Sequence, residues 1–455
     1  MAAMPAPFDN PDEAHPIPPR FWWLKRISIG LGAYVLFLAL VRIGWGYYAE
    51  SRLQSALATW RAAGQPVTID DLAPRPVPDK ENGAWYIQQA ILKKAVPAGM
   101  PNDVYWQALN VDAYRDGPVE IEQIVAANTE PLALLRVARA CTESDWGYTL
   151  RSPLVNSMRW DWSPERQLAR LVRLAALRAQ VTGNDSEWLE GARDLLAFGR
   201  HLGQSEPFLI GHITRLGIDG LVAGRVQAFS HALRVGADDE RDAAGRAAKR
   251  AQVAALIADL CDEHPVASAW ARSMFGERLL QLDAFQNPGV RPVYWGFSRR
   301  QVAASRLALE PGWKLGALRV ATLQSDLADA PPERLLTSAR AEDDPARASG
   351  LIPFLVRGPY ALSGFPLPSA ARVQLAHLAF RRMAAAALAI RLYELDHGRR
   401  PAQLADLVPD YLPAVPVDPL AADGREIAYH PDAEPPVLYS VGENGTDDGG
   451  KPAET

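Results

Sequence analysis

The chain has 455 residues, which is too many for one ordinary hydrophobic core and predicts two or three domains. Hydrophobic residues make up 48% and charged residues 22%, proportions that are typical of folded proteins and argue against general disorder. The formal net charge is -5, and the basic residues are scattered rather than gathered in one stripe, so nucleic acid is excluded as an expected partner.

The amino-terminal region predicts a membrane anchor. Residues 1–19 are rich in proline, alanine and acidic side chains, which predicts a disordered cytoplasmic tail. An apolar run then begins at Ile27 and ends at Tyr48, between two groups of aromatic residues. As a helix, a run of about 22 residues is roughly 33 Å long, enough to cross the hydrocarbon core of a bilayer. We therefore expect residues 20–48 to form a transmembrane signal anchor that contacts the lipid bilayer through residues 27–48.

The charges around this run predict its orientation. Arg20, Lys25 and Arg26 precede it, which places the amino terminus in the cytoplasm and the bulk of the chain outside. A cleaved signal peptide is the alternative, but Trp45 and Tyr47 stand where small residues would be needed for cleavage. Because no second run approaches membrane length, the sequence predicts a single-pass protein of a bacterial inner membrane, with its carboxyl-terminal bulk in the periplasm.

The region that follows, residues 49–350, is predicted to be an exported α-helical domain. The first helix continues to about residue 63, with Leu53, Leu57 and Trp60 on one face. Ser186 is predicted to cap a later helix. The expected helices that follow the first lie at 82–94, 121–140, 165–182, 187–202, in a segment ending near 235, and at 238–264.

Short connections between these helices predict antiparallel hairpins. The expected fold class is therefore mainly α: a transmembrane helix, an irregular α-helical array of antiparallel hairpins and a small terminal module. Residues 351–370 are rich in proline, glycine and aromatic side chains and are predicted to be the linker into that module, residues 371–455.

Two groups of residues could carry chemistry in the helical domain. Cys261 and His264 are spaced to share a helix face, and Trp160-Asp161-Trp162 could form an aromatic patch for a sugar. The simpler interpretation is that the first pair ends a helix before a proline, and that the tryptophans pack against the core at a helix start. As an alternative function, we keep an exported hydrolase or carbohydrate-active protein with a cleft in this domain, lined by Trp160, Asp161, Trp162, Asp145 and His264.

The two cysteines, Cys141 and Cys261, have no partners at metal-ligand spacing. Both lie in apolar helical patterns, where a free cysteine usually behaves as a small buried side chain. A single bridge between them in an oxidising compartment is the alternative, and both possibilities stay open at this point.

The carboxyl-terminal segment carries an ordered series of short motifs. A long helix, 372–397, ends at His397-Gly398 and is followed by a loop with Pro416-Val417-Asp418-Pro419. Short strands are expected at 427–429 and 437–440, before the glycine-rich run 442–450. In this order the segment resembles the globular domain of the major pseudopilins of type II secretion systems. The resemblance implies a pilin-like α+β module.

The last loop could also hold an ion. Glu443, Asn444, Asp447 and Asp448 place four oxygen-bearing side chains within a glycine-rich run, and Asp418 could reach them from the preceding loop. Calcium takes six to eight such oxygens in flexible geometry. In pseudopilins this loop binds calcium, so the resemblance implies the same for Asp447 and Asp448. A solvated acidic turn is the alternative interpretation.

The departures from the family are large. The short leader, the Gly-Phe cleavage site and the first-turn glutamate of a pseudopilin do not occur here, and a long helical domain separates the membrane helix from the pilin-like module. Polymerisation as a pilin is therefore not expected. Taken whole, the chain resembles uncharacterised bacterial single-pass membrane proteins with this ending. The sequence predicts a non-catalytic interaction or envelope-assembly protein, with an envelope protein of unknown identity as its partner.

Overall fold

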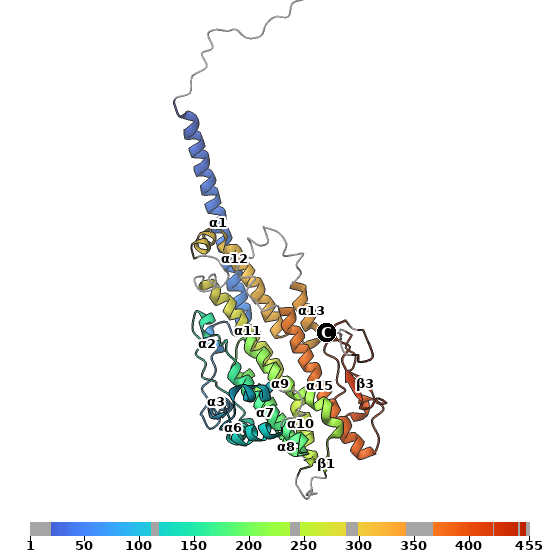
Figure 1. The fold of residues 1–455 in the computed structure, drawn as a ribbon. Coiled ribbons are helices and arrows are strands. Elements are labelled where there is room, and N and C mark those ends of the chain that lie inside the picture. The colour runs from blue at the N-terminus through green and yellow to red at the C-terminus, as the bar shows by residue number, and fades with distance from the viewer. Residues whose placement is uncertain are drawn as a thin grey trace, which may run out of the picture.

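The fold is mainly helical and is described here from a computed structural model (Figure 1). The structure describes residues 20–110, 118–236, 246–287, 299–342, 367–421, 423–444 and 446–451. Of the predicted linker at 351–370, only the last four residues lie among them, as the start of a helix. The disordered tail predicted at 1–19 lies outside the described residues.

Helix α1, Trp22–Ala62, is 41 residues long and projects from the rest of the molecule (Figure 1). Its most apolar window has a mean hydropathy of 2.0, and none of that window is buried in the protein. Leu31, Leu36 and Ile43 are each at least 60% exposed, which is unfavourable in water and favourable in a bilayer. The predicted membrane helix is therefore present as a candidate span.

A second helix, α15 (Leu367–His397), also has the length and hydropathy of a membrane span, with a mean hydropathy of 1.2. The sequence analysis did not expect a second candidate. In the structure 78% of its apolar window is buried inside the protein. Packing against other helices explains its apolar surface, and α15 serves as the central helix of the fold.

The remaining helices form the predicted irregular array. Consecutive helices α7 and α8 pack along their length as an antiparallel hairpin, as do α8 and α9. The helix bounds are α2 (Ile69–Leu72), α3 (Gly83–Lys93), α4 (Asn102–Asn110), α5 (Pro118–Ala127), α6 (Thr129–Ala140), α7 (Ser163–Val181), α8 (Asp185–Ser205), α9 (Leu209–Phe229), α10 (Arg250–Cys261), α11 (His264–Gln286), α12 (Arg299–Ala328) and α13 (Pro332–Glu342).

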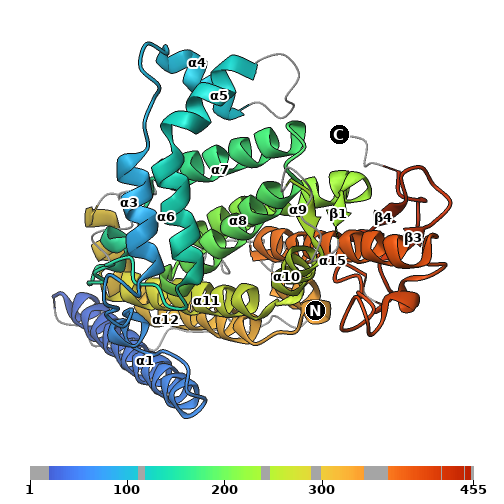
Figure 2. The same ribbon diagram turned by 90° about the horizontal axis from the view of Figure 1, so that it is seen from below.

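Strands contribute little to the fold. Strands β1 (Val235–Gly236) and β2 (Ala248–Lys249) form one short parallel pair. The two strands predicted near the carboxyl terminus are confirmed as an antiparallel hairpin of β3 (Ala428–His430) and β4 (Val437–Tyr439). This hairpin lies beyond the end of α15, on the side of the molecule away from α3 and α6 (Figure 2).

One predicted helix, 121–140, is in fact two helices. The break is at Asn128, which is fully buried. Its side-chain oxygen accepts a hydrogen bond from the Ala95 N–H at 2.8 Å, and its amide nitrogen donates to the Ala95 carbonyl at 2.8 Å. This paired contact with a loop 33 residues away outweighs local helix propensity, because an unpaired buried amide would be costly.

Two further boundaries differ from the predictions. Asn184, rather than Ser186, caps α8 by accepting a hydrogen bond from the Glu187 N–H. The helix predicted at 238–264 ends at Cys261, and His264 opens α11 with Pro265 in its first turn. Proline is favoured there because its missing N–H has no helical partner in the first turn anyway. Both Cys141 and Cys261 are free thiols.

One hydrophobic core includes residues from both sides of the domain boundary predicted at 371. It extends from Ala84 in α3 to Ile427 beside β3, and it includes Leu388 of α15 and Val226 of α9. Helix α15 packs against α9 and α10. The terminal helix is thus part of the core of the helical array.

Candidate functional site

The candidate site lies where α1, the candidate membrane span, joins the folded body. From Arg42, near the end of the apolar run, α1 turns one face to α12. The three residues predicted to share a face, Leu53, Leu57 and Trp60, pack together there against Leu318 and Ala321. The spacing of three and four residues that predicts a helix face therefore also identifies the surface that is buried.

Ion pairs also join α1 to α12 along this interface. Arg42 pairs with Glu310 at 3.2 Å, and Glu50 pairs with Lys314 at 2.5 Å. Hydrogen bonding to Lys314 holds the pKa of the Glu50 carboxyl below its usual value. Because residue numbers rise together along the contact, α1 and α12 run parallel.

The end of α1 is fastened by a buried arginine. Arg278 of α11 is fully buried, and its guanidinium lies 4.4 Å from the ring centre of Trp60. It also donates to the side-chain oxygen of Gln65 at 2.5 Å. The hydroxyl of Ser325 donates to the same oxygen at 2.6 Å. The chain just past α1 is therefore tied to both α11 and α12.

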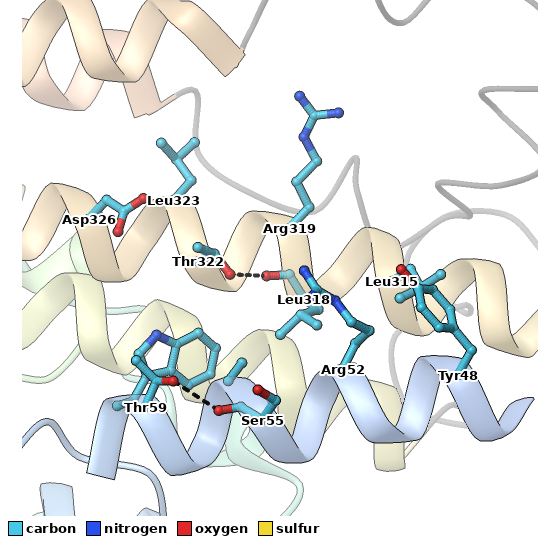
Figure 3. A pocket seen from close by; sticks show the side chains of 12 residues that line it. Tyr48, Arg52, Ser55, Thr59, Leu315, Leu318, Arg319, Thr322, Leu323 and Asp326 are labelled. Atoms are coloured by element: carbon cyan, nitrogen blue, oxygen red, sulfur yellow. Dashed lines mark hydrogen bonds between the residues drawn. The ribbon is translucent and has the colours of Figure 1, made fainter. Parts of the chain in front are cut away.

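A groove of about 550 Å³ lies between α1 and α12 (Figure 3). Tyr48 and Arg52 of α1 stand at one end, and Asp326 of α12 stands at the other. Its lining consists of Tyr48, Arg52, Ser55, Ala56, Thr59, Trp60, Leu315, Leu318, Arg319, Thr322, Leu323 and Asp326.

The chemistry of this lining suits binding. Arg52 and Arg319 can donate to an anion, and both are exposed. The hydroxyls of Thr59 and Thr322 already donate to the carbonyls of Ser55 and Leu318, which leaves them available as acceptors. The lining holds two arginines, one carboxylate and several apolar side chains.

Two of the residues predicted to bind calcium make hydrogen bonds or ion pairs with other residues of the chain. Asp418 is 1% exposed and accepts hydrogen bonds from the Leu420 and Val441 N–H groups and from the Ser440 hydroxyl. Glu443 pairs with Arg340 and Arg372 instead.

The other predicted ligands form local turns. Asp447 accepts from the Tyr439 hydroxyl at 2.8 Å, Asn444 accepts from the Thr446 N–H, and Asp448 is exposed. Within the described ranges, no group of three or more acidic, histidine or cysteine side chains could hold a metal. The five residues do not converge on one point in this arrangement, so calcium binding stays a prediction and no role is derived from it.

The residues of the predicted catalytic cleft do not share one described cavity. Trp162 is fully buried, whereas Trp160 is 65% exposed. Asp161 accepts from the Ser163 N–H at the start of α7, and Asp145 accepts from the Gly147 N–H in a turn. The tryptophan pair therefore divides between core and solvent, and the two aspartates stabilise local backbone.

His264 lies away from this group. It is exposed and contacts the Ser268 hydroxyl one turn along α11. Trp162 packs near Gly211 at the start of α9, and the preceding Pro207 contacts α11 at Gly276. Twelve residues of helix separate His264 from that contact, a distance of about 18 Å.

The sequence analysis missed a buried charged cluster between α9 and α15. Asp219 is 1% exposed and lies 3.2 Å from Arg215, 3.5 Å from His377 and 3.6 Å from Arg381. Burial alone would raise the pKa of Asp219, but the two guanidiniums and His377 outweigh it and lower the pKa. The only sequence signal was the four-residue spacing of Arg215 and Asp219.

Arg381 also links this cluster to α10. Its guanidinium donates to the carbonyls of Asp259, Leu260 and Asp262 at the end of that helix. Helix carboxyl ends carry unpaired carbonyls and partial negative charge, so a buried arginine is stabilised there. The cluster thus joins α9, α10 and α15, and its role is structural.

A second buried acid, Glu206, predicts a pH dependence of stability. Burial raises the pKa of Glu206 to about 7, and its carboxyl accepts from the Phe208 N–H ahead of α9. The pKa of Glu206 is higher in the folded state than in the unfolded state. The carboxyl group therefore stabilises the fold fully below about pH 4.5, and this stabilisation is lost as the pH rises through about 7.

As the pH falls from 8 to 5, the free energy of unfolding of wild type should therefore rise relative to that of Glu206→Gln, by at most about 3 kcal/mol. Melting temperatures of the two proteins across this range check the prediction. Glu434→Gln, at a side chain that is 82% exposed, sets the baseline. A difference between wild type and Glu206→Gln that stays constant with pH would contradict the assignment.

Comparisons of the chain with protein-family models, with curated proteins and with solved structures gave no match. Nothing in them bears on the pseudopilin resemblance.

Proposed function

We propose that this chain is a membrane-anchored, non-catalytic interaction protein of a bacterial inner membrane. In this proposal α1 spans the membrane with its amino terminus in the cytoplasm, and the helical array lies in the periplasm. The array presents a surface to an envelope protein. One observation carries the proposal: α1 continues without a break from its apolar, unburied part into packed contact with α12.

This continuity fixes the helical array relative to the membrane. A flexible tether would need a break rich in glycine or proline between the span and the body. Instead, residues 49–62 continue the same helix for about 20 Å, and ion pairs at Arg42 and Glu50 join it to α12. A body held at a fixed height and angle suits a protein that positions a partner at the membrane surface.

The orientation is tested with reporter fusions to the full chain. Alkaline phosphatase fused after Thr455 should be active and green fluorescent protein at the same position should be dark, because the first folds only outside the cytoplasm and the second only within it. The same reporters fused before Met1 should give the reverse pattern. A fluorescent carboxyl-terminal fusion with inactive phosphatase would contradict the proposed orientation.

The interaction itself is tested by chemical cross-linking of the full chain in intact cells. We expect adducts with an envelope protein that persist through membrane solubilisation. A chain carrying residues 1–62 alone, which keeps the anchor without the helical array, should lose these adducts. Recovery of the same adducts with the anchor alone would show that the array is not the binding surface.

A further inference from the structure

The groove between α1 and α12 begins at the membrane surface on the proposed periplasmic side. Tyr48 ends the apolar run, and Tyr48 and Arg52 are the groove residues nearest to it. Thr59, the most distant hydroxyl that α1 contributes, lies eleven residues further along, about 17 Å from Tyr48 along the helix. A molecule that entered the groove from the membrane would therefore meet Tyr48 and Arg52 first.

Arg52 is the side chain that most needs a partner. In the described part of the chain no hydrogen bond or ion pair engages it, although Glu50, two residues earlier on the same helix, is held by Lys314. Arg319 of α12 lines the same groove and adds a second positive charge. The one carboxylate in the lining, Asp326, lies two helical turns beyond Arg319, at the end away from Tyr48.

The other side chains of the groove suit the parts of a phospholipid headgroup around the phosphate. Leu315 and Leu318 supply apolar surface beside Arg52, and Tyr48 and Ser55 supply hydroxyls (Figure 3). One guanidinium group can donate two parallel hydrogen bonds to two oxygens of a phosphate, which makes arginine better suited than lysine to bind it. Basic side chains close to a membrane surface also attract anionic lipids.

From this arrangement we propose that the groove binds the phosphate headgroup of an anionic phospholipid whose acyl chains stay in the bilayer. Arg52 donates to the phosphate, Arg319 adds charge from the opposite helix, and Tyr48 contacts the glycerol region at the interface. A bound lipid joins α1 to α12 beside the Glu50–Lys314 pair. The inference deepens the proposed function, because it makes the fixed position of the helical array depend on the lipid at its base.

The test uses the purified full chain in detergent, with dioleoyl-phosphatidylglycerol or dioleoyl-phosphatidylcholine added. The anionic lipid should raise the melting temperature of wild type by about 3 °C more than the zwitterionic lipid does, because a ligand that binds only the folded state stabilises it. Equal shifts with both lipids would overturn the proposal without any variant.

Variants locate the effect in the groove. The double variant Arg52→Gln/Arg319→Gln should lose the difference between the lipids, and Arg61→Gln, an exposed arginine of α1 outside the groove, should keep it. Both altered side chains are exposed, so the melting temperature without lipid should stay within about 1 °C of wild type. A double variant that retains the full lipid difference would contradict the site.

Soluble glycerol phosphate separates a lipid from a free anion. At millimolar concentration it should give no shift, because a lipid headgroup anchored in the same detergent micelle as α1 is held at far higher local concentration. A shift equal to that of the lipid would assign the groove to a soluble phosphate instead. These measurements do not depend on which side of the membrane the array faces, so their failure and a failure of the reporter fusions are distinguishable.

Discussion

Replacing Asp219 with alanine should lower the melting temperature of the purified protein by about 6 °C or more. The carboxylate is buried between Arg215, His377 and Arg381, and its removal leaves two buried guanidiniums without a counter-charge. Breaking a buried pair by removing one partner typically costs about 3–5 kcal/mol. Differential scanning fluorimetry of wild type and variant in the same detergent measures the effect.

The matched control is Asp423→Ala. Asp423 pairs with Arg425 at 2.6 Å, but its side chain is 55% exposed, and solvent screens such a pair so that it contributes little to stability. The two substitutions remove the same group and differ in burial. Similar shifts for both variants would mean that the Asp219 cluster does not join α9, α10 and α15 as described.

The second large effect is expected at Gly276. A methyl group added there would lie 1.6 Å from the carbonyl oxygen of Pro207, an approach that backbone atoms cannot relieve without moving α11 away from the start of α9. Overpacking of this kind costs about 1–3 kcal/mol and occasionally more, and a clash with backbone places Gly276→Ala at or above the upper end. Urea or thermal unfolding checks the prediction.

Gly220→Ala provides the opposite expectation within a neighbouring helix. Gly220 is exposed on α9, and an added methyl group would meet nothing within 4 Å. Alanine is favoured over glycine in a helix by about 0.5–1 kcal/mol, so this variant should be slightly more stable than wild type. If Gly276→Ala also stabilised the protein, the close approach of α11 to Pro207 would be wrong.

Local patterns in the sequence predicted most of the helices and the terminal hairpin. The apolar run of α1 predicted the candidate membrane span, and the spacing of Leu53, Leu57 and Trp60 identified the face that contacts α12. The two strands β3 and β4 were expected from the order of motifs in the pseudopilin resemblance. These elements are defined by residues close together in the chain.

Features that depend on distant partners were missed. Asn128 breaks a helix because it pairs with Ala95, and no local pattern records that pairing. The boundary predicted at residue 371 did not use one signal in the sequence: α15 has an apolar window of membrane-span length, and 78% of that window is buried in the structure. A module of residues 371–455 is too small to surround it, so α9 and α10 do so.

The candidate groove could not be predicted for the same reason. It forms between two parallel helices whose contacting residues are more than 260 positions apart, such as Glu50 and Lys314. Arg52 looked like one exposed helix residue among many. Only the packing of α12 beside α1 places it in a groove with a second wall.

The contact between α1 and α12 is the central claim, and site-directed cross-linking in native membranes tests it most directly. Glu50→Cys and Lys314→Cys would be combined in a Cys141→Ser/Cys261→Ser background, with a protease site inserted at residues 288–298 so that linked halves stay together after cleavage. A short bis-maleimide reagent should join the two halves in most molecules. A control pair, Glu50→Cys with Asp423→Cys, should stay unlinked. If the two halves of the Glu50→Cys/Lys314→Cys protein separated as completely as those of the control, a rigid connection between α1 and the helical array would be contradicted.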